Sequence, residues 1–191
     1  MNTKLIKTLI IIVLILLLIL VLTKILKVQN IILKIIYPLE YLEYVYKYSE
    51  EYDLDPLLSF AIIKAESNFD EKAVSTSNAV GLMQLLEKTA EEIAAQDLQM
   101  KEFYKEDLYN PETNIKIGLK YFSKLLKEYD YNYNLALAAY NAGTGNVKKW
   151  IEQGIINKAG ENIEKIPFKE TNNYVRKVNR NYKIYKDLYE R

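Results

Sequence analysis

The sequence predicts an all-α protein in which a single helical domain follows one N-terminal transmembrane helix. Three observations support this prediction. No part of the 191-residue chain shows sustained alternation of apolar and polar side chains, the pattern of a half-buried strand. From about residue 38 onward, apolar residues recur at the three- and four-residue steps of amphipathic helices. Before that point, residues 8–23 form an uncharged apolar run between two lysines.

The apolar run near the N-terminus is expected to cross a membrane. As a helix, residues 8–23 would span about 24 Å, and snorkelling lysines with the apolar residues that follow extend this toward the roughly 30 Å hydrocarbon core. No small-residue cleavage site or lipid-accepting cysteine follows the run. We therefore expect an uncleaved anchor at 1–27, in contact with the lipid bilayer through residues 8–26, and a juxtamembrane connector at 28–37. Lysines flank the run on both sides, so charge leaves the orientation open.

Helix start and stop signals divide residues 38–191 into successive helices of one domain. Asp55 before Pro56 is typical of an N-cap followed by the first helical residue, and Asn110 before Pro111 repeats the pattern. Gly143 is suited to end a short helix. The helices expected from these signals cover residues 39–52, 56–69, 79–95, 111–129, 134–142, 147–153 and 171–189.

Composition excludes several kinds of chemistry. The chain has no cysteine and no histidine, so thiol nucleophiles, Ser-His-Asp triads and the usual zinc sites are ruled out. We expect no metal and no cofactor, and chemistry must come from carboxylates, hydroxyls, amides or lysines. Residues 1–39 hold five lysines and no acid, which leaves 21 basic and 25 acidic residues in the remainder. No basic face is available for nucleic acid, so that class of partner is not expected.

Glu66 is the candidate catalytic residue. It falls in the same helical stripe as Leu58, Ile62, Ile63 and Phe69, where a core residue is expected. Burial penalises an ionised carboxyl, and a carboxylic acid that keeps its proton near neutral pH can act as a general acid. The alternative is that Glu66 turns to solvent at the helix end or pairs with a lysine.

Three other short segments have compositions suited to a binding site. Gly81–Leu85 places the amide of Gln84 beside apolar residues, Ala138–Gly143 sets Tyr140 and Asn141 among small residues, and Glu170 lies at a helix start. Each has an ordinary structural alternative: a helix start with a close-packed glycine, a tight helix crossing with a glycine cap, and an N-cap.

Taken together and in order, these segments resemble the catalytic domain of the soluble lytic transglycosylases, glycoside hydrolase family 23, whose fold is similar to goose-type lysozyme. The resemblance covers about residues 40 to 190, through Glu66-Ser67; Ser75 with Ala79–Leu85 and Thr89-Ala90; Ala139–Gly143 with Val147 and Trp150; and Ile166–Phe168 with Glu170-Thr171 and Tyr174-Val175. It implies a lysozyme-like helical domain at 38–191.

The resemblance also implies roles for individual residues. Glu66 matches the family's single catalytic acid/base. The positions that match the sugar-binding groove are Ser75, Gln84, Leu86, Tyr140, Asn141 and Glu170. The sequence departs from the family where Leu86-Glu87 replaces the common Met-Pro, which keeps an apolar contact and adds a charge to the rim, and where Asn78 replaces glycine.

The implied activity is cleavage of peptidoglycan between N-acetylmuramic acid and N-acetylglucosamine, with formation of 1,6-anhydromuramic ends. This substrate requires a single-pass membrane protein whose domain lies outside the cytoplasm. Three alternatives stay open: a muramidase-type hydrolase with a second carboxylate such as Glu170 or Glu87, a non-catalytic wall-binding module, and a helical membrane adaptor. The sequence indicates no protein partner.

Overall fold

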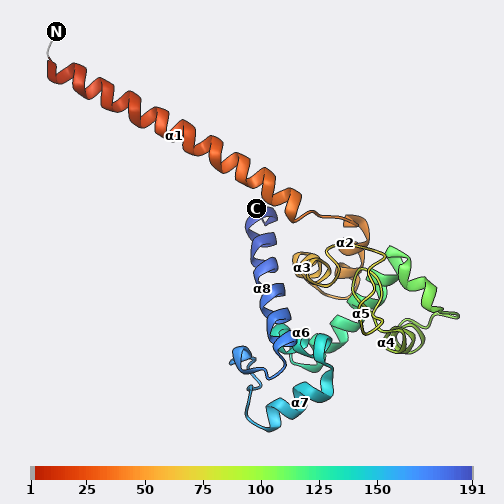
Figure 1. The fold of residues 1–191 in the computed structure, drawn as a ribbon. Coiled ribbons are helices and arrows are strands. Elements are labelled where there is room, and N and C mark those ends of the chain that lie inside the picture. The colour runs from red at the N-terminus through yellow and green to blue at the C-terminus, as the bar shows by residue number, and fades with distance from the viewer. Residues whose placement is uncertain (1–2, 191) are drawn as a thin grey trace. The chain divides into compact units, whose positions relative to one another are not determined.

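The computed structural model describes residues 3–190 and divides into two compact units, residues 1–38 and 39–191 (Figure 1). The first two residues of the expected anchor and Arg191 lie outside the described residues. The first unit is a single helix, α1 (Thr3–Ile36), which continues without a break through the expected connector. Within the described part of the chain, Ile15–Ile36 is the stretch that is long and apolar enough to cross a bilayer, by length and composition.

The second unit is built from helices, which confirms the predicted all-α class. Its described residues contain no strand, only isolated bridges from Val80 to Val74 and to Leu85. The helices in chain order are α2 (Leu42–Glu51), α3 (Pro56–Glu66), α4 (Glu87–Glu92), the π-helical turn η1 (Ile93–Asp97), the 3₁₀ turn η2 (Lys105–Tyr109), α5 (Pro111–Glu128), α6 (Tyr133–Ala142), α7 (Thr144–Glu152), the 3₁₀ turn η3 (Ile163–Lys165) and α8 (Lys169–Tyr189).

Helix α3 forms the centre of the domain. Every residue from Leu57 to Ile63 is buried, so this helix is apolar around its whole circumference and other elements surround it. Helix α8 packs along α3 (Figure 1). The Asn181 amide donates a hydrogen bond to the Ala61 carbonyl at 3.4 Å, and the Lys177 ammonium donates to the Ala65 carbonyl at 2.5 Å. These contacts hold the carboxyl end of α3, where Glu66 lies, against α8.

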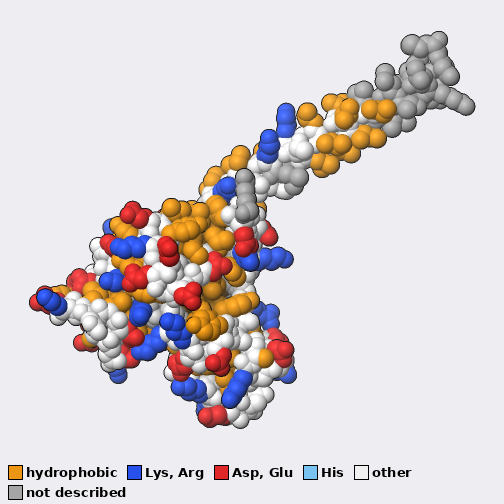
Figure 2. All heavy atoms as spheres, turned by 180° about the vertical axis from the view of Figure 1, so that it is seen from behind, with side chains coloured by type: hydrophobic (Ala, Val, Ile, Leu, Met, Phe, Trp, Pro, Cys, Tyr) orange, Lys and Arg blue, Asp and Glu red, His pale blue; other side chains and the backbone are white. Residues whose placement is uncertain are grey.

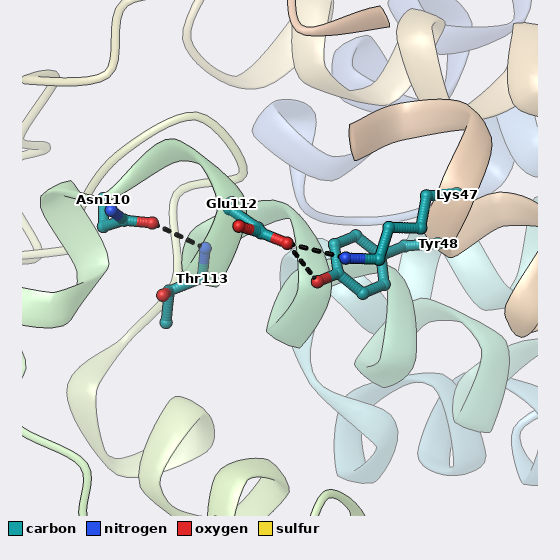
Figure 3. Close-up of polar contacts among 5 residues, drawn as sticks. All are labelled: Lys47, Tyr48, Asn110, Glu112 and Thr113. Atoms are coloured by element: carbon teal, nitrogen blue, oxygen red, sulfur yellow. Dashed lines mark hydrogen bonds and ion pairs between the residues drawn. The ribbon is translucent and has the colours of Figure 1, made fainter. Parts of the chain in front are cut away.

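The start of α5 is fixed by polar contacts, as Figure 3 shows. The Asn110 side chain accepts a hydrogen bond from the Thr113 amide at 3.0 Å, as predicted for an N-cap before Pro111. Glu112 accepts from the Lys47 ammonium at 2.8 Å and the Tyr48 hydroxyl at 2.7 Å, both on α2. The cap and the link to α2 set the register of α5, and with it the position of the next buried polar residue, Asn114.

The predicted helix at 79–95 is wrong in its first half. Residues 79–86 form a compact loop, and α4 begins only at Glu87. Gly81 has φ of 78° and Gln84 φ of 48°, both in the left-handed region, which a right-handed helix cannot contain. A β-carbon at Gly81 would lie 2.2 Å from the Asn114 amide nitrogen, so glycine is also required by the close approach.

Candidate active site

Glu66 is the last residue of α3, so the helix expected to run through Phe69 ends earlier, because Asn68 and Phe69 have φ of 55° and 68°, in the left-handed region. The Glu66 carboxyl lies in a largely buried position among α3, α6 and α8. The pKa of Glu66 is raised from 4.5 to about 7, mainly by burial and to a smaller extent by the nearby charge of Glu170. The Tyr174 hydroxyl and the Lys177 ammonium act in the opposite direction and lower the pKa. A substantial fraction of Glu66 is therefore protonated at neutral pH, in agreement with its place in an apolar stripe.

Two tyrosines on different helices surround this carboxyl. Burial and the Glu66 carboxylate raise the pKa of Tyr140 and of Tyr174 well above 10, so both phenols are neutral at physiological pH. The Tyr140 hydroxyl donates to the Met83 carbonyl at 2.8 Å. The Tyr174 hydroxyl interacts with Glu66 strongly enough to affect its pKa, yet it forms no well-aligned hydrogen bond within the described part of the chain. The Tyr174 hydroxyl is thus available to donate a hydrogen bond to the Glu66 carboxylate when Glu66 ionises.

The loop at 79–86 is held in place by Asn114 of α5. The Asn114 side chain accepts from the Met83 amide at 2.8 Å and donates to the Val80 carbonyl at 3.0 Å and the Leu108 carbonyl at 2.8 Å. All four residues that take part are buried. One amide side chain therefore fixes both the loop that carries Gln84 and the carbonyl to which Tyr140 donates.

Ser75 and Gln84 use their polar groups to shape this region. The Ser75 hydroxyl oxygen accepts from the Ala79 amide at 3.0 Å, which closes the turn before the loop. The Gln84 side-chain nitrogen donates to the carbonyls of Ala73 at 3.1 Å and Gly81 at 3.0 Å. On α6, the Asn141 side-chain oxygen accepts from the Thr171 hydroxyl at 2.7 Å, which ties α6 to the start of α8.

Four of the predicted substrate-binding residues meet in one cavity of about 230 Å³. These are Gln84, Leu86, Tyr140 and Asn141, and the lining is completed by Leu85, Thr89, Tyr121, Ala142 and Gly143. None of these side chains is charged. The exposed apolar side chain of Leu86 and the rings of Tyr121 and Tyr140, whose centroids are 5.3 Å apart, form walls suited to the faces of neutral sugars. We call this cavity the neutral groove.

The remaining predicted site residues lie outside the lining of the neutral groove. Glu66 is connected to it through Tyr140, which lines the groove and interacts electrostatically with Glu66. Glu170 is exposed at the first turn of α8 and reaches Glu66 through its charge, while Ser75 acts within the preceding turn.

Sequence reasoning assigned no role to Tyr121, Asn114 or Lys177. Tyr121 adjoins Phe122 on α5, and its sequence context is that of an aromatic residue packed in the core. Its place beside the apolar stripe, rather than in it, is the signal that could have indicated a groove residue. Asn114 had the clearest signal that was missed: a polar residue immediately before buried Ile115 can itself be buried and hydrogen-bonded to the backbone. Nothing in the local sequence pointed to Lys177, which acts on Glu66 from a distant part of the chain.

Residues 43–163 match the profile of the Transglycosylase SLT domain. The chain belongs to this family. It is 35% identical over 153 residues to the soluble lytic murein transglycosylase of Salmonella typhimurium, covering 74% of this chain and 22% of that protein. It is 32% identical over 170 residues to membrane-bound lytic murein transglycosylase C of Serratia proteamaculans, covering 77% of this chain and 47% of that protein.

The solved structures give the same assignment to the SLT family. The lytic transglycosylase Slt of Pseudomonas aeruginosa, solved as an inactive mutant with glutamine in place of a glutamate, superposes with a TM-score of 0.75 at 33% identity. The match covers 81% of this chain and 25% of that chain. The lysozyme-like SLT fold expected for the helical domain is thereby confirmed. This chain corresponds to about a quarter of the soluble relatives and about half of the membrane-bound one.

Proposed function

We propose that this SLT-family chain is a membrane-anchored peptidoglycan lytic transglycosylase that cleaves the β-1,4 bond between N-acetylmuramic acid and N-acetylglucosamine. The observation that carries the proposal is Glu66, a carboxyl whose burial raises its pKa to about 7, connected through Tyr140 to an uncharged groove. The names of the relatives and the inactive Glu-to-Gln form of the Pseudomonas protein support the same reaction class.

In the proposed mechanism Glu66 acts first as an acid and then as a base. Its protonated carboxyl donates the proton to the glycosidic oxygen, the C1–O bond breaks, and the acetamido oxygen of the N-acetylmuramic acid closes on C1. The Glu66 carboxylate then removes the proton from the C6 hydroxyl of the same sugar. The C6 oxygen attacks C1 and displaces the acetamido oxygen, which gives a 1,6-anhydro ring. Glu66 ends protonated, and no water is consumed.

The contacts of Glu66 suit a group that must change charge during one turnover. While Glu66 is neutral, its largely buried position stabilises the acid form. Once it ionises, the Tyr174 hydroxyl and the Lys177 ammonium stabilise the carboxylate. The neutral groove would hold the sugars, with Gln84, Leu86, Tyr140 and Asn141 as contacts, and Ser75 would shape its rim.

A hydrolase of the muramidase type is the alternative that one observation favours. Glu170 lies near enough to Glu66 to raise its pKa, so a second carboxylate is present at the site. Glu87 is less suited to such a role because it is exposed and pairs with Lys105 at 3.6 Å. Glu170 is also exposed, and an exposed carboxylate is poorly suited to hold one water against the sugar. We therefore favour the transglycosylase.

The proposed reaction determines the membrane topology. Peptidoglycan lies outside the cytoplasmic membrane, so α1 would contain both the single-pass anchor, residues 1–27, and most of the connector at 28–37, with the catalytic domain at 38–191 on the outer side. The apolar stretch Ile15–Ile36 and the membrane-bound relative support this arrangement. A reporter fused after Arg191 is expected to be active outside the cytoplasm, and cytoplasmic activity of the reporter would refute the topology.

The proposed reaction can be tested on the full chain in detergent micelles. The protein and its Glu66→Gln variant are incubated with purified peptidoglycan, and released muropeptides are analysed by mass spectrometry. We expect products one water lighter than muramidase products, and none from Glu66→Gln. Ordinary reducing ends would assign a hydrolase, and glycan binding without product from the wild type would assign a non-catalytic wall-binding module.

A further inference from the structure

Helix α1 is longer than a bilayer requires. Its 34 residues span about 51 Å, whereas a hydrocarbon core is roughly 30 Å thick and a whole bilayer with its headgroups about 40 to 45 Å. With the uncharged run 8–23 centred in the core, the core ends at about residue 25 and the outer headgroup layer at about residue 30. Residues 31–36 then lie beyond the headgroups, in contact with water.

Two other placements of this outer part are disfavoured by the sequence. Moving the whole stretch Ile15–Ile36 into the bilayer would put Lys24 and Lys27 in the hydrocarbon, where charged side chains are costly. Turning the outer part along the membrane surface would require a kink. Residues 1–37 contain neither proline nor glycine, the usual causes of a kink, and α1 is continuous over its described residues. The outer part therefore projects from the membrane as a straight helix.

The projecting part exposes large apolar side chains. Ile31 and Ile32 are 61% and 50% exposed, and Ile35 and Ile36 are 73% and 47% exposed. In the anchor such side chains would contact lipid, but beyond the headgroups they contact water. A contiguous row of exposed isoleucines on a helix is a surface that another protein element covers.

The polar residues of the outer half of α1 avoid one stripe of the helix. Ile25, Val28, Ile32 and Ile35 recur at alternating three- and four-residue steps, the a and d positions of a heptad. We call these four residues the α1 seam. The polar residues all lie at other heptad positions: Lys24, Lys27, Gln29, Asn30 and Lys34. A repeat of 3.5 residues is that of helices that wrap around one another.

Another copy of this chain fits the α1 seam. Copies inserted into one membrane have the same orientation, so their seams meet in parallel. In a parallel pair, position g of one helix faces the following position e of its neighbour. Lys24 then faces Gln29, and Ile31 faces Ile36. The other two lysines of the outer half occupy position c, on the side away from the seam, so no like charges are brought together.

The driving force for association lies in the outer half of the helix. Residues 9–22 are all leucine, isoleucine or valine, without the small residues that let membrane helices approach closely. In lipid these side chains exchange one apolar neighbour for another, whereas burial of the outer isoleucines removes apolar surface from water. Ile31 and Ile36, at positions g and e, widen the seam. β-Branched residues at both a and d favour three strands over two.

We propose that the chain forms a parallel homo-oligomer through the α1 seam, with three copies as the expected number. This inference rests on the membrane topology of the proposed function, because it takes residues 8–23 as the part that crosses the bilayer. Several copies of the domain would be held beside the same region of peptidoglycan. A glycan strand released by one domain could then be bound by the next at high effective concentration.

The first experiment measures the mass of the full chain in detergent micelles by analytical ultracentrifugation. Ile32→Lys places a charge in the seam, and Asn30→Lys places the same charge at position f, away from it. We expect the wild type and Asn30→Lys to have the mass of three chains, and Ile32→Lys to require at least about tenfold higher concentration to assemble. Two chains, dissociated by Ile32→Lys alone, would also support the seam.

The same variants contradict the proposal if they behave alike. A monomeric wild type would overturn it, as would an oligomer that Ile32→Lys leaves intact. Flotation with lipid vesicles separates loss of association from loss of anchoring, since Ile32→Lys is expected to float like the wild type.

Cysteine cross-linking tests the seam in intact membranes. Because the chain has no cysteine, one introduced cysteine reports on one position. Oxidation is expected to link Val28→Cys into pairs, since d residues of parallel neighbours lie within reach of a disulfide, and to leave Asn30→Cys unlinked. Equal cross-linking of the two variants would indicate random collision and would overturn the proposal.

Both measurements are independent of catalysis, so they separate this inference from the proposed reaction. They can be repeated in a Glu66→Gln background, where no product is expected. A wild type that assembles but releases no product would refute only the reaction. A monomeric chain that releases 1,6-anhydro products would refute only the seam.

Discussion

The pKa of Glu66 is set by its burial at the end of α3 and by three residues of α8, which shift it in opposite directions. Burial at the end of α3 raises the pKa, and the charge of Glu170 at the start of α8 raises it further. Tyr174 and Lys177, one and two turns along α8 from Glu170, lower it. The result, about 7, lies at the pH where a single carboxyl can be protonated before bond cleavage and ionised after it.

Replacing Tyr174 by Phe is expected to raise the pKa of Glu66 above about 7, because the change removes a contact that lowers it and leaves the burial. General-acid catalysis requires protonated Glu66, so kcat/KM should fall above about pH 7 in the wild type and at a higher pH in Tyr174→Phe. The measurement is a pH–rate profile on peptidoglycan. The matched control is Tyr131→Phe, an exposed tyrosine. A descending limb at the same pH in wild type and Tyr174→Phe would contradict this assignment.

Replacing Glu66 by Gln should make stability less dependent on pH. The folded-state pKa of about 7 exceeds the ordinary 4.5, so between these values the folded chain binds more protons than the unfolded chain. The free energy of unfolding therefore decreases as pH rises through this window, by about 3 kcal/mol in total.

The measurement is urea unfolding at pH 5 and pH 8, followed by the fluorescence of buried Trp150. Relative to the wild type, Glu66→Gln is expected to gain stability at pH 8. The same pH dependence in both proteins would show that Glu66 ionises with little penalty.

At the scale of elements, the site depends on a loop that has little regular structure of its own. Residues 79–86 are held by the two hydrogen bonds of Asn114 to Met83 and Val80 and by the close approach of Gly81 to that side chain. The Met83 carbonyl in turn accepts from Tyr140. The first turn of α5 thus positions one wall of the neutral groove.

Asn114→Ala is expected to destabilise the domain by about 2 kcal/mol or more, because it leaves the buried Met83 amide and Leu108 carbonyl without their Asn114 partner, while the Val80 carbonyl still accepts from the Leu85 amide. Activity should fall even below the unfolding transition, since Tyr140 loses its fixed acceptor. Urea unfolding and the initial rate of product release measure the two effects. Asn173→Ala, at an exposed position of α8, is the control and should stay within about 0.5 kcal/mol of the wild type. Full activity in folded Asn114→Ala would contradict the role given to the loop.

The sequence predicted elements where the signal was local and missed them where it was not. Asp55 before Pro56, Asn110 before Pro111 and Gly143 marked helix ends that the structure has at those positions, because caps involve neighbours in sequence. The loop at 79–86 was taken for a helix because its conformation depends on Asn114, which bonds to it across about thirty residues.

The residues of the candidate site likewise fall into those with a local sequence signal and those without one. Glu66 could be selected from the apolar stripe around it, and Gln84, Tyr140 and Asn141 from unusual local composition. Glu170, which raises the pKa of Glu66, was also selected, but Lys177 could not be, because it meets the end of α3 across 112 residues of sequence. Helical periodicity predicts which face of α8 is buried, but not which partner that face meets.

At the scale of the whole molecule, charge is distributed unevenly along the chain. Residues 1–39 carry five lysines and no acid, whereas acids outnumber bases by 25 to 21 in the rest. On the face shown in Figure 2, acidic and basic side chains are interspersed over the domain without a large field of one sign. This face therefore offers no large field of one sign that could attract a charged substrate over a distance, and under the proposed function the membrane anchor would keep the domain near the peptidoglycan.

The anchor can be tested with charges placed in its apolar stretch. Leu16→Arg/Leu20→Arg introduces two arginines that each cost about 2.5 to 3.5 kcal/mol at the centre of a spanning helix. We expect this variant to float poorly with lipid vesicles, while the control Leu16→Ala/Leu20→Ala, which keeps the segment apolar, floats like the wild type. Cleavage of soluble glycan fragments should be the same in all three proteins, because neither residue belongs to the domain that carries Glu66. Flotation of the arginine variant at the wild-type level would show that α1 does not hold the chain in the bilayer.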